Sequence, residues 1–169
     1  MSKYFGHNVT KDNTNKDLLL KVLIAIVVIV FAVAVIYGAY GLHITRQYQL
    51  FVEDYTTSLN HARRNGGLTV HRGGETWRLD NDTGSRIYTD VLDADSWKPQ
   101  KKEPNEDMIE LIFPDGAEMK VCEVEIMEEA RIRDQGIFIY YMNKDGKVYM
   151  YDTDRIDVES FMGYFRNPE

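Results

Sequence analysis

The sequence predicts an α+β fold, in which a single N-terminal transmembrane helix precedes a mostly antiparallel sheet of about six strands with two or three helices. Three observations lead to this fold class: an uninterrupted apolar run, an apolar stripe of helical period directly after it, and pairs of short segments joined by turn residues. Because adjacent strands are joined as hairpins, we expect the helices to gather on one face of the sheet.

The apolar run covers residues 22–36 without a polar side chain and extends to about residues 18–42. A stretch of that length exceeds the roughly 20 residues that a helix needs to cross a bilayer. Lys21 lies one turn inside its start, where a long side chain can reach the headgroups. Tyr37 and Tyr40 lie at the other end, where aromatic belts form. The run therefore predicts a membrane anchor.

A cleaved signal peptide is the alternative interpretation of this run, because residues 32–34 read Ala-Val-Ala, a small-x-small cleavage pattern. The apolar run continues past this pattern without a polar break, which favours an uncleaved anchor. Lys3, Lys11 and Lys16 precede the run, and Arg46 is the first basic side chain after it. The positive-inside rule then keeps the N-terminus in the cytoplasm and exports the C-terminal domain across the cell membrane.

The expected organisation has four parts: a disordered cytoplasmic tail at residues 1–17, the transmembrane helix at residues 18–42, a juxtamembrane helix at residues 43–65 and an extracytoplasmic α+β domain at residues 66–169. The juxtamembrane helix is predicted from apolar residues at spacings of four and three. They are Tyr48, Val52, Tyr55, Leu59 and Ala62. We expect Gly66-Gly67 to end this helix, and we favour packing of the stripe on the protein's own sheet over oligomerisation.

Six strands are expected in three pairs, because each pair flanks residues typical of a tight turn. The pairs are residues 68–72 with 75–79, residues 108–113 with 117–126, and residues 136–142 with 147–151. Residues 96–106 are expected to form a loop, and residues 127–135 either a strand extension or a helical turn. Further helices are expected at about residues 83–92 and 156–165, with Asp82 and Asp154 as their N-caps.

The charge balance excludes one class of partner. Beyond residue 42 the chain carries 16 basic and 25 acidic side chains, so this part is strongly acidic. Such a domain is a poor match for nucleic acid, whose binding rests on the neutralisation of phosphates.

The sequence contains no nucleophile elbow and no glycine-rich phosphate loop. We therefore predict no catalytic, cofactor-binding or metal-binding residues.

For each residue that could serve in catalysis or metal binding, a structural role fits the sequence better than a chemical one. Cys122 alternates with apolar neighbours, which predicts a buried thiol. His61 and His71 lack a zinc-ligand spacing and are expected on the surface. Two acidic regions fail the pattern of a calcium loop and are interpreted as a helix cap and a hairpin turn. The first comprises Asp80, Asp82, Asp90, Asp93 and Asp95, and the second is residues 143–146.

Aromatic residues are dense near the C-terminus. Tyr140 and Tyr141 point to opposite faces of one strand. Exposed tyrosines would suit a partner surface, but we favour aromatic pairing within the core, beneath the last helix, for this group as a whole. The group comprises Tyr140, Tyr141, Tyr149, Tyr151, Phe161, Tyr164 and Phe165.

The function predicted from these features is non-enzymatic: a membrane-anchored, extracytoplasmic binding or accessory domain that engages a partner protein or ligand at the membrane surface. The bilayer is expected to hold residues 18–42, and a second membrane protein is the expected partner. Two alternatives remain open. One is a small membrane-tethered hydrolase that uses paired carboxylates, with or without calcium, and the other is a purely structural surface protein.

Overall fold

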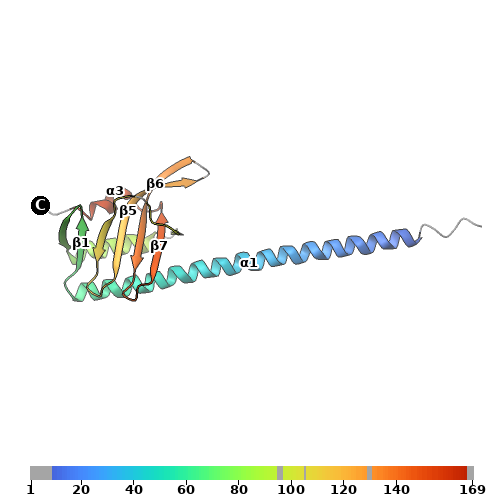
Figure 1. Cartoon of the computed structure of the whole chain (residues 1–169), viewed down its shortest axis with the longest axis horizontal. Helices are drawn as coiled ribbons and strands as arrows, with labels where there is room; N and C mark the ends of the chain where they lie inside the picture. Colours follow the sequence, from blue (N-terminus) through green and yellow to red (C-terminus); the bar gives the residue numbers. More distant parts are fainter. Residues whose placement is uncertain (1–8, 95–96, 105, 129–130, 167–169) are drawn as a thin grey trace, which may run out of the picture. The chain divides into compact units, whose positions relative to one another are not determined.

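The computed structural model describes residues 9–94, 97–104, 106–128 and 131–166 of the chain. These residues form an α+β fold with three helices and one seven-stranded antiparallel sheet (Figure 1). The strand order is β2-β1-β4-β5-β6-β7-β3. The bounds are β1 Leu68–Arg72, β2 Glu75–Leu79, β3 Lys98–Pro99, β4 Ile109–Ile112, β5 Glu118–Glu128, β6 Arg131–Met142 and β7 Val148–Thr153.

One strand more is present than the sequence predicts. Strand β3 lies within the segment 96–106, for which the sequence predicts a loop, and it pairs with β7 at the edge of the sheet. A strand of two residues is too short to show an alternation of polar and apolar side chains in the sequence. Proline is tolerated in this strand because it lies at the edge of the sheet. In the ambiguous stretch 127–135 the structure extends β5 to Glu128 and begins β6 at Arg131.

The long helix α1 spans Val9–Arg64 and begins inside the segment for which the sequence predicts a disordered tail. Residues 1–8 of that tail lie outside the described residues. The chain divides into two compact units, residues 1–46 and 47–169, and α1 contributes residues to both. In the first unit, α1 is by length and composition able to cross a membrane, and its apolar residues are exposed.

Helix α1 ends at the predicted glycine pair. The Gly67 N–H donates to the carbonyl of Ala62 at 2.8 Å, and Gly66 and Gly67 have φ angles of 100° and 85°. Glycine adopts this left-handed conformation without steric cost. A Cβ atom at Gly67 would also lie 2.8 Å from the carbonyl oxygen of Leu79, so the chain turns there against the sheet.

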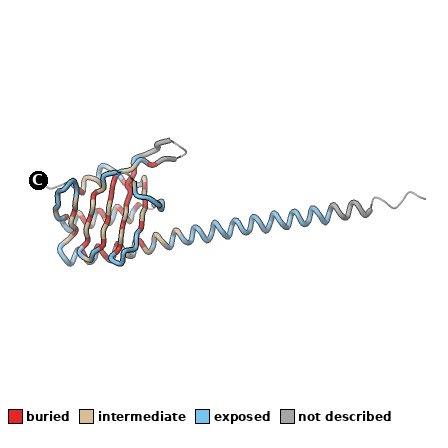
Figure 2. Tube along the Cα trace, in the orientation of Figure 1, coloured by how far each residue is buried: buried red, intermediate tan, exposed pale blue. Residues whose placement is uncertain are grey.

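The predicted stripe of α1 packs on the protein's own sheet. Tyr55, Leu59 and Ala62 are buried in the main core, and Tyr48 and Val52 pack against it. Helices α2 (Asn81–Asp93) and α3 (Val158–Gly163) contribute Ile87, Val91 and Phe161 to the same core. The inward positions alternate along the strands, as the tube coloured by burial shows (Figure 2). One face of the sheet is therefore the covered face, which carries the main core.

Phe51 is the centre of an aromatic cluster that the predicted stripe does not include. Its ring lies 5.8 Å from Tyr55, 5.7 Å from Tyr141, 5.8 Å from Tyr149 and 5.2 Å from Tyr151. The expected aromatic pairing in the core is present. The strand tyrosines nevertheless pair beneath α1 rather than beneath the last helix, because α1 supplies the facing ring.

A group of polar side chains also fixes α1 to the turn between β6 and β7. One carboxylate oxygen of Asp54 accepts hydrogen bonds from Asn143 Nδ2 at 2.9 Å and from the Tyr149 hydroxyl at 2.6 Å. Asn143 Oδ1 in turn accepts from the backbone N–H groups of Asp145 and Lys147, which closes the turn. The residues 143–146 thus form a hairpin turn, as the sequence predicts.

The predicted N-caps at Asp82 and Asp154 are wrong. Helix α2 begins at Asn81, and Asp80 is its cap, with Oδ1 accepting from the Thr83 N–H at 2.8 Å. Helix α3 begins at Val158, and Asp157 Oδ1 accepts from the Ser160 N–H at 2.7 Å. For α2, Asp80 and Asp82 both fit the cap pattern, so the sequence does not decide which of them precedes the helix. Helix α3 starts later than predicted, and its cap Asp157 lies outside the Asp-x-Asp sequence at residues 152–154.

Candidate functional site

The second face of the sheet, the open face, carries polar and apolar side chains in cross-strand rows. Lys120, Tyr140 and Met150 lie opposite one another on β5, β6 and β7, and each is half-buried. The Lys120 ammonium lies 5.6 Å from the centre of the Tyr140 ring and 3.4 Å from a carboxylate oxygen of Glu110. Tyr140 is therefore the one strand tyrosine of the predicted group that lies on this face.

A second, smaller apolar cluster lies on the open face. Cys122 and Phe138 are 2% exposed and Ile126 is 7% exposed, although none of them belongs to the main core. Gly136 gives Ile126 its space, because a Cβ at Gly136 would collide with the Ile126 side chain and lie 2.6 Å from the Thr153 carbonyl oxygen. Burial, with a contribution from Glu106, raises the pKa of the Cys122 thiol to about 11. The predicted buried thiol is confirmed.

Three hydrogen bonds attach the segment before β4, one to helix α2 and two to strand β7. The Trp97 ring N–H donates to the Val91 carbonyl at 2.9 Å, and the Gln100 N–H donates to the Met150 carbonyl at 2.9 Å. The Gln100 side chain then donates to Asp152 Oδ2 at 2.6 Å. These bonds hold the segment beside strands β5, β6 and β7.

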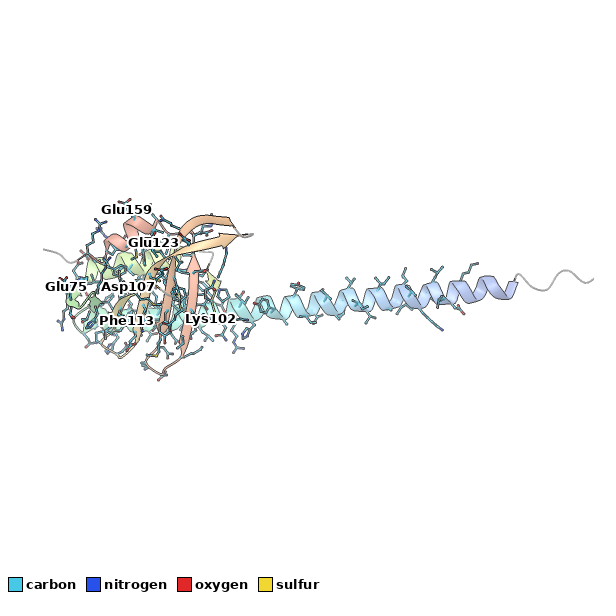
Figure 3. All side chains as sticks on the ribbon, turned by 45° about the horizontal axis from the view of Figure 1, so that its top comes forward. Glu75, Lys102, Asp107, Phe113, Glu123 and Glu159 are labelled. Atoms are coloured by element: carbon cyan, nitrogen blue, oxygen red, sulfur yellow. The ribbon has the colours of Figure 1, made fainter. Side chains whose placement is uncertain are left out.

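A cleft of about 550 Å³ lies between this segment and the sheet, and we call it the open-face cleft. That volume falls within the range of about 300–1,000 Å³ that is typical of ligand sites. It is lined by Gln100, Lys102, Pro104, Glu106, Glu123, Val124, Glu125, Gln135, Phe138 and Asp152. Lys102 and Glu123, which come from the segment and from β5, are labelled in Figure 3.

The lining of the open-face cleft is acidic. The described residues that line it contribute four carboxylates and one ammonium group, that of Lys102. Phe138 and Asp152 are cross-strand neighbours and so point to the same side of the sheet. Glu123 and Glu125 alternate with Val124, so they lie on the other side of β5 and border the cleft at its edge.

Asp152 is the carboxylate with the most unusual surroundings. Gln100 satisfies its Oδ2 atom, whereas its Oδ1 atom is buried without a hydrogen-bond partner. Burial is the main cause that raises the pKa of Asp152, and Asp154 adds to the rise, while Lys98 and the Gln100 hydrogen bond oppose it. Burial thus disfavours the charge of this carboxylate, and carboxylates with perturbed pKa values cluster at functional sites.

The remaining sequence candidates do not converge on this cleft. His61 is exposed on α1, and His71 on β1 hydrogen-bonds to Thr76 at 3.0 Å. Asp80 is a helix cap, and Asp95 lies outside the described residues. Within the part of the chain that the structure describes, no group of three or more His, Cys, Asp or Glu side chains is arranged to hold a metal ion.

Sequence reasoning missed Gln100 and Asp152 for different reasons. Gln100 lies in the segment interpreted as a loop, next to the short strand β3. Asp152 lies two residues before the N-cap predicted at Asp154, so its position suggested no role beyond the start of that helix. The available signal was the strand period of β7, which places Asp152 opposite Phe138 once the register is known.

Comparisons of the chain with protein-family models, with curated proteins and with solved structures gave no match.

Proposed function

We propose that this chain is a single-pass protein of the cell membrane, and that its C-terminal domain, on the outer side, binds a partner protein through the open-face cleft. The anchor would be residues 18–42, which belong to a helix long and apolar enough to cross a bilayer. The basic residues before this segment favour a cytoplasmic N-terminus. The function proposed is therefore binding or accessory rather than catalytic.

The observation that carries the proposal is the combination of two features in the cleft. The cleft has a buried apolar floor at Phe138 and a carboxylate oxygen without a partner at Asp152. Buried polar atoms are normally hydrogen-bonded, because an unsatisfied one costs about 1–3 kcal/mol. A partner that occupies the cleft would supply the missing contact.

Position-specific photo-crosslinking in native membranes tests this function. A benzoylphenylalanine at position 102 places the photo-reactive group on the wall of the cleft. The matched control carries the same group at position 159, an exposed residue of α3, which covers the other face. We expect a crosslinked protein of defined mass from position 102 and not from position 159.

Equal crosslinking from both positions, or none from position 102, would contradict binding at the cleft. Protease added to intact cells tests the orientation separately. It should remove the domain and leave a short membrane-bound fragment that retains Met1 or Ser2. A mature N-terminus at Val35 would instead show that the apolar run is a cleaved signal peptide.

A further inference from the structure

The lining of the open-face cleft also restricts the chemistry of its ligand. Among the lining residues that the structure describes, the charged side chains are Asp152, Glu106, Glu123 and Glu125 against Lys102. Anionic ligands would be repelled by three carboxylates in excess. Lys98 offsets the charge of Asp152 only in part, since burial still raises its pKa and the Oδ1 atom has no hydrogen-bond partner, and a cationic ligand would supply both a donor and a charge.

The position of Asp152 favours a planar, forked cation. Its Oδ2 atom already accepts from Gln100 at 2.6 Å, and the Oδ1 atom remains free to accept. A guanidinium group presents several N–H donors in one plane, so it can bond to Oδ1 and reach a second acceptor at the same time. An ammonium group offers the same charge without this geometry.

The size of the cleft indicates that the cation belongs to a longer chain. A volume of about 550 Å³ exceeds what one side chain fills, and the floor at Phe138 and Val124 offers apolar contact beside the charge. Arginine is enriched at protein interfaces because its stem packs against apolar surface while its head pairs with a carboxylate.

We infer that the open-face cleft recognises an arginine side chain of the partner protein, and that Asp152 is the residue that determines this specificity. This inference rests on the proposed function, since it names the chemistry of the partner at the same cleft. Glu106, Glu123 and Glu125 would attract the basic segment, and Gln100 would hold the Asp152 carboxylate in place.

The test uses the full chain in a non-ionic detergent and two peptides that differ in charge. The probe is N-acetyl-Gly-Arg-Gly-amide, and its neutral counterpart carries citrulline, which keeps the shape of arginine without its charge. We expect the arginine peptide to bind at least tenfold more tightly by calorimetry. Asp152→Asn should weaken its binding at least tenfold, whereas Asp154→Asn, directly after the same strand, should not.

A second variant keeps the inference testable if Asp152→Asn does not fold. Glu106→Lys changes an exposed residue of the segment and places a cation at the cleft, so it should also weaken binding of the arginine peptide. Equal binding of the two peptides, or unchanged binding to folded Asp152→Asn, would overturn the inference. Tighter binding of spermidine than of the arginine peptide would overturn it too, in favour of a free polyamine.

The crosslinking experiment separates failure of this inference from failure of the proposed function. If no protein crosslinks at position 102, the proposed function itself fails. If a protein crosslinks there and neither the arginine peptide nor Asp152→Asn reduces the yield, the partner binds at the cleft without the arginine, and this inference alone is wrong. A reduced yield with the arginine peptide, and not with the citrulline peptide, would support both.

Discussion

The two faces of the sheet are built from the same strands and differ in what covers them. The covered face holds α1, α2 and α3 over a continuous apolar core, in which Phe51, Tyr55 and Tyr141 are fully buried. The open face holds a small cluster around Phe138 and a cleft whose carboxylate, Asp152, has an unsatisfied oxygen. The large apolar core therefore lies on one face, and the acidic cleft lies on the other.

This difference follows from the alternation of side chains along a strand. On β6, Ile137, Ile139 and Tyr141 point to the helices, whereas Phe138 and Tyr140 point away from them. A substitution on one face can therefore be matched with its neighbour on the other face. The comparison predicts large losses of stability on the covered face and losses of binding on the open one.

The largest expected effect is that of Phe51→Ala. Removal of a fully buried ring from the centre of the aromatic cluster should cost about 3–5 kcal/mol, since it removes buried surface and leaves a cavity. Tyr140→Ala, on the open face, should cost less than about 1 kcal/mol. Thermal unfolding of the full chain in detergent, followed by the near-ultraviolet circular dichroism of the aromatic residues, measures both. Equal losses would contradict the assignment of the core to the covered face.

The next effect concerns the polar contact between α1 and the β6–β7 turn. Asp54→Ala leaves the Tyr149 hydroxyl and the Asn143 amide without their acceptor, and should cost about 1–3 kcal/mol. Glu53→Ala is the matched control, because Glu53 is the exposed neighbour on the same helix and should change stability by less than about 0.5 kcal/mol. The same unfolding measurement applies. A loss for Glu53→Ala as large as for Asp54→Ala would show that helix content, and not this contact, matters.

The helix caps should have a smaller effect. Asp80→Ala and Asp157→Ala should each lower the melting temperature by a few degrees, whereas Asp82→Ala and Asp154→Ala should lower it less. Hydrogen bonds from the Thr83 and Ser160 N–H groups lower the pKa values of the two caps below the ordinary 3.8. The stability that they add is therefore complete above pH 3.8 and is lost as the pH falls through the lowered values. A melt at pH 7 should show the full difference, and a melt at pH 2.5 should show a smaller one.

The sequence predicts the covered face well because period and composition determine it. The stripe at Tyr55, Leu59 and Ala62 indicated which side of α1 is buried, and the turn glycines placed the hairpins. Strand β3 and the cleft could not be predicted in this way. They depend on the register that places Asp152 beside Lys98 and Phe138, and on hydrogen bonds of Gln100 that span 50 residues or more of sequence. Such long-range contacts leave no local period.

The smallest effect, a gain of stability, is expected from Asp152→Asn, and it separates a binding role from a structural one. Asn keeps an oxygen that accepts from Gln100 and removes the charge that burial disfavours. For an acid with a raised pKa, the folded state binds the proton more tightly than the unfolded state, so stability falls as the pH rises from 3.8 through the raised value.

The advantage of Asp152→Asn over the wild type should therefore be absent below pH 3.8, develop as the pH rises through that window and persist at pH 7. Because Asp152 is half-buried, we expect a rise in melting temperature of about 1 °C. The charged groups around Asp152 are Lys98 on β3, Asp154 directly after β7, and Lys102 and Glu106 on the segment before β4. Melts of Asp154→Asn over the same pH range control for the general loss of a negative charge. If Asp152→Asn instead lowers the melting temperature at pH 7, the ionised carboxylate stabilises the fold through its neighbours, and the cleft would lose its strongest argument as a ligand site.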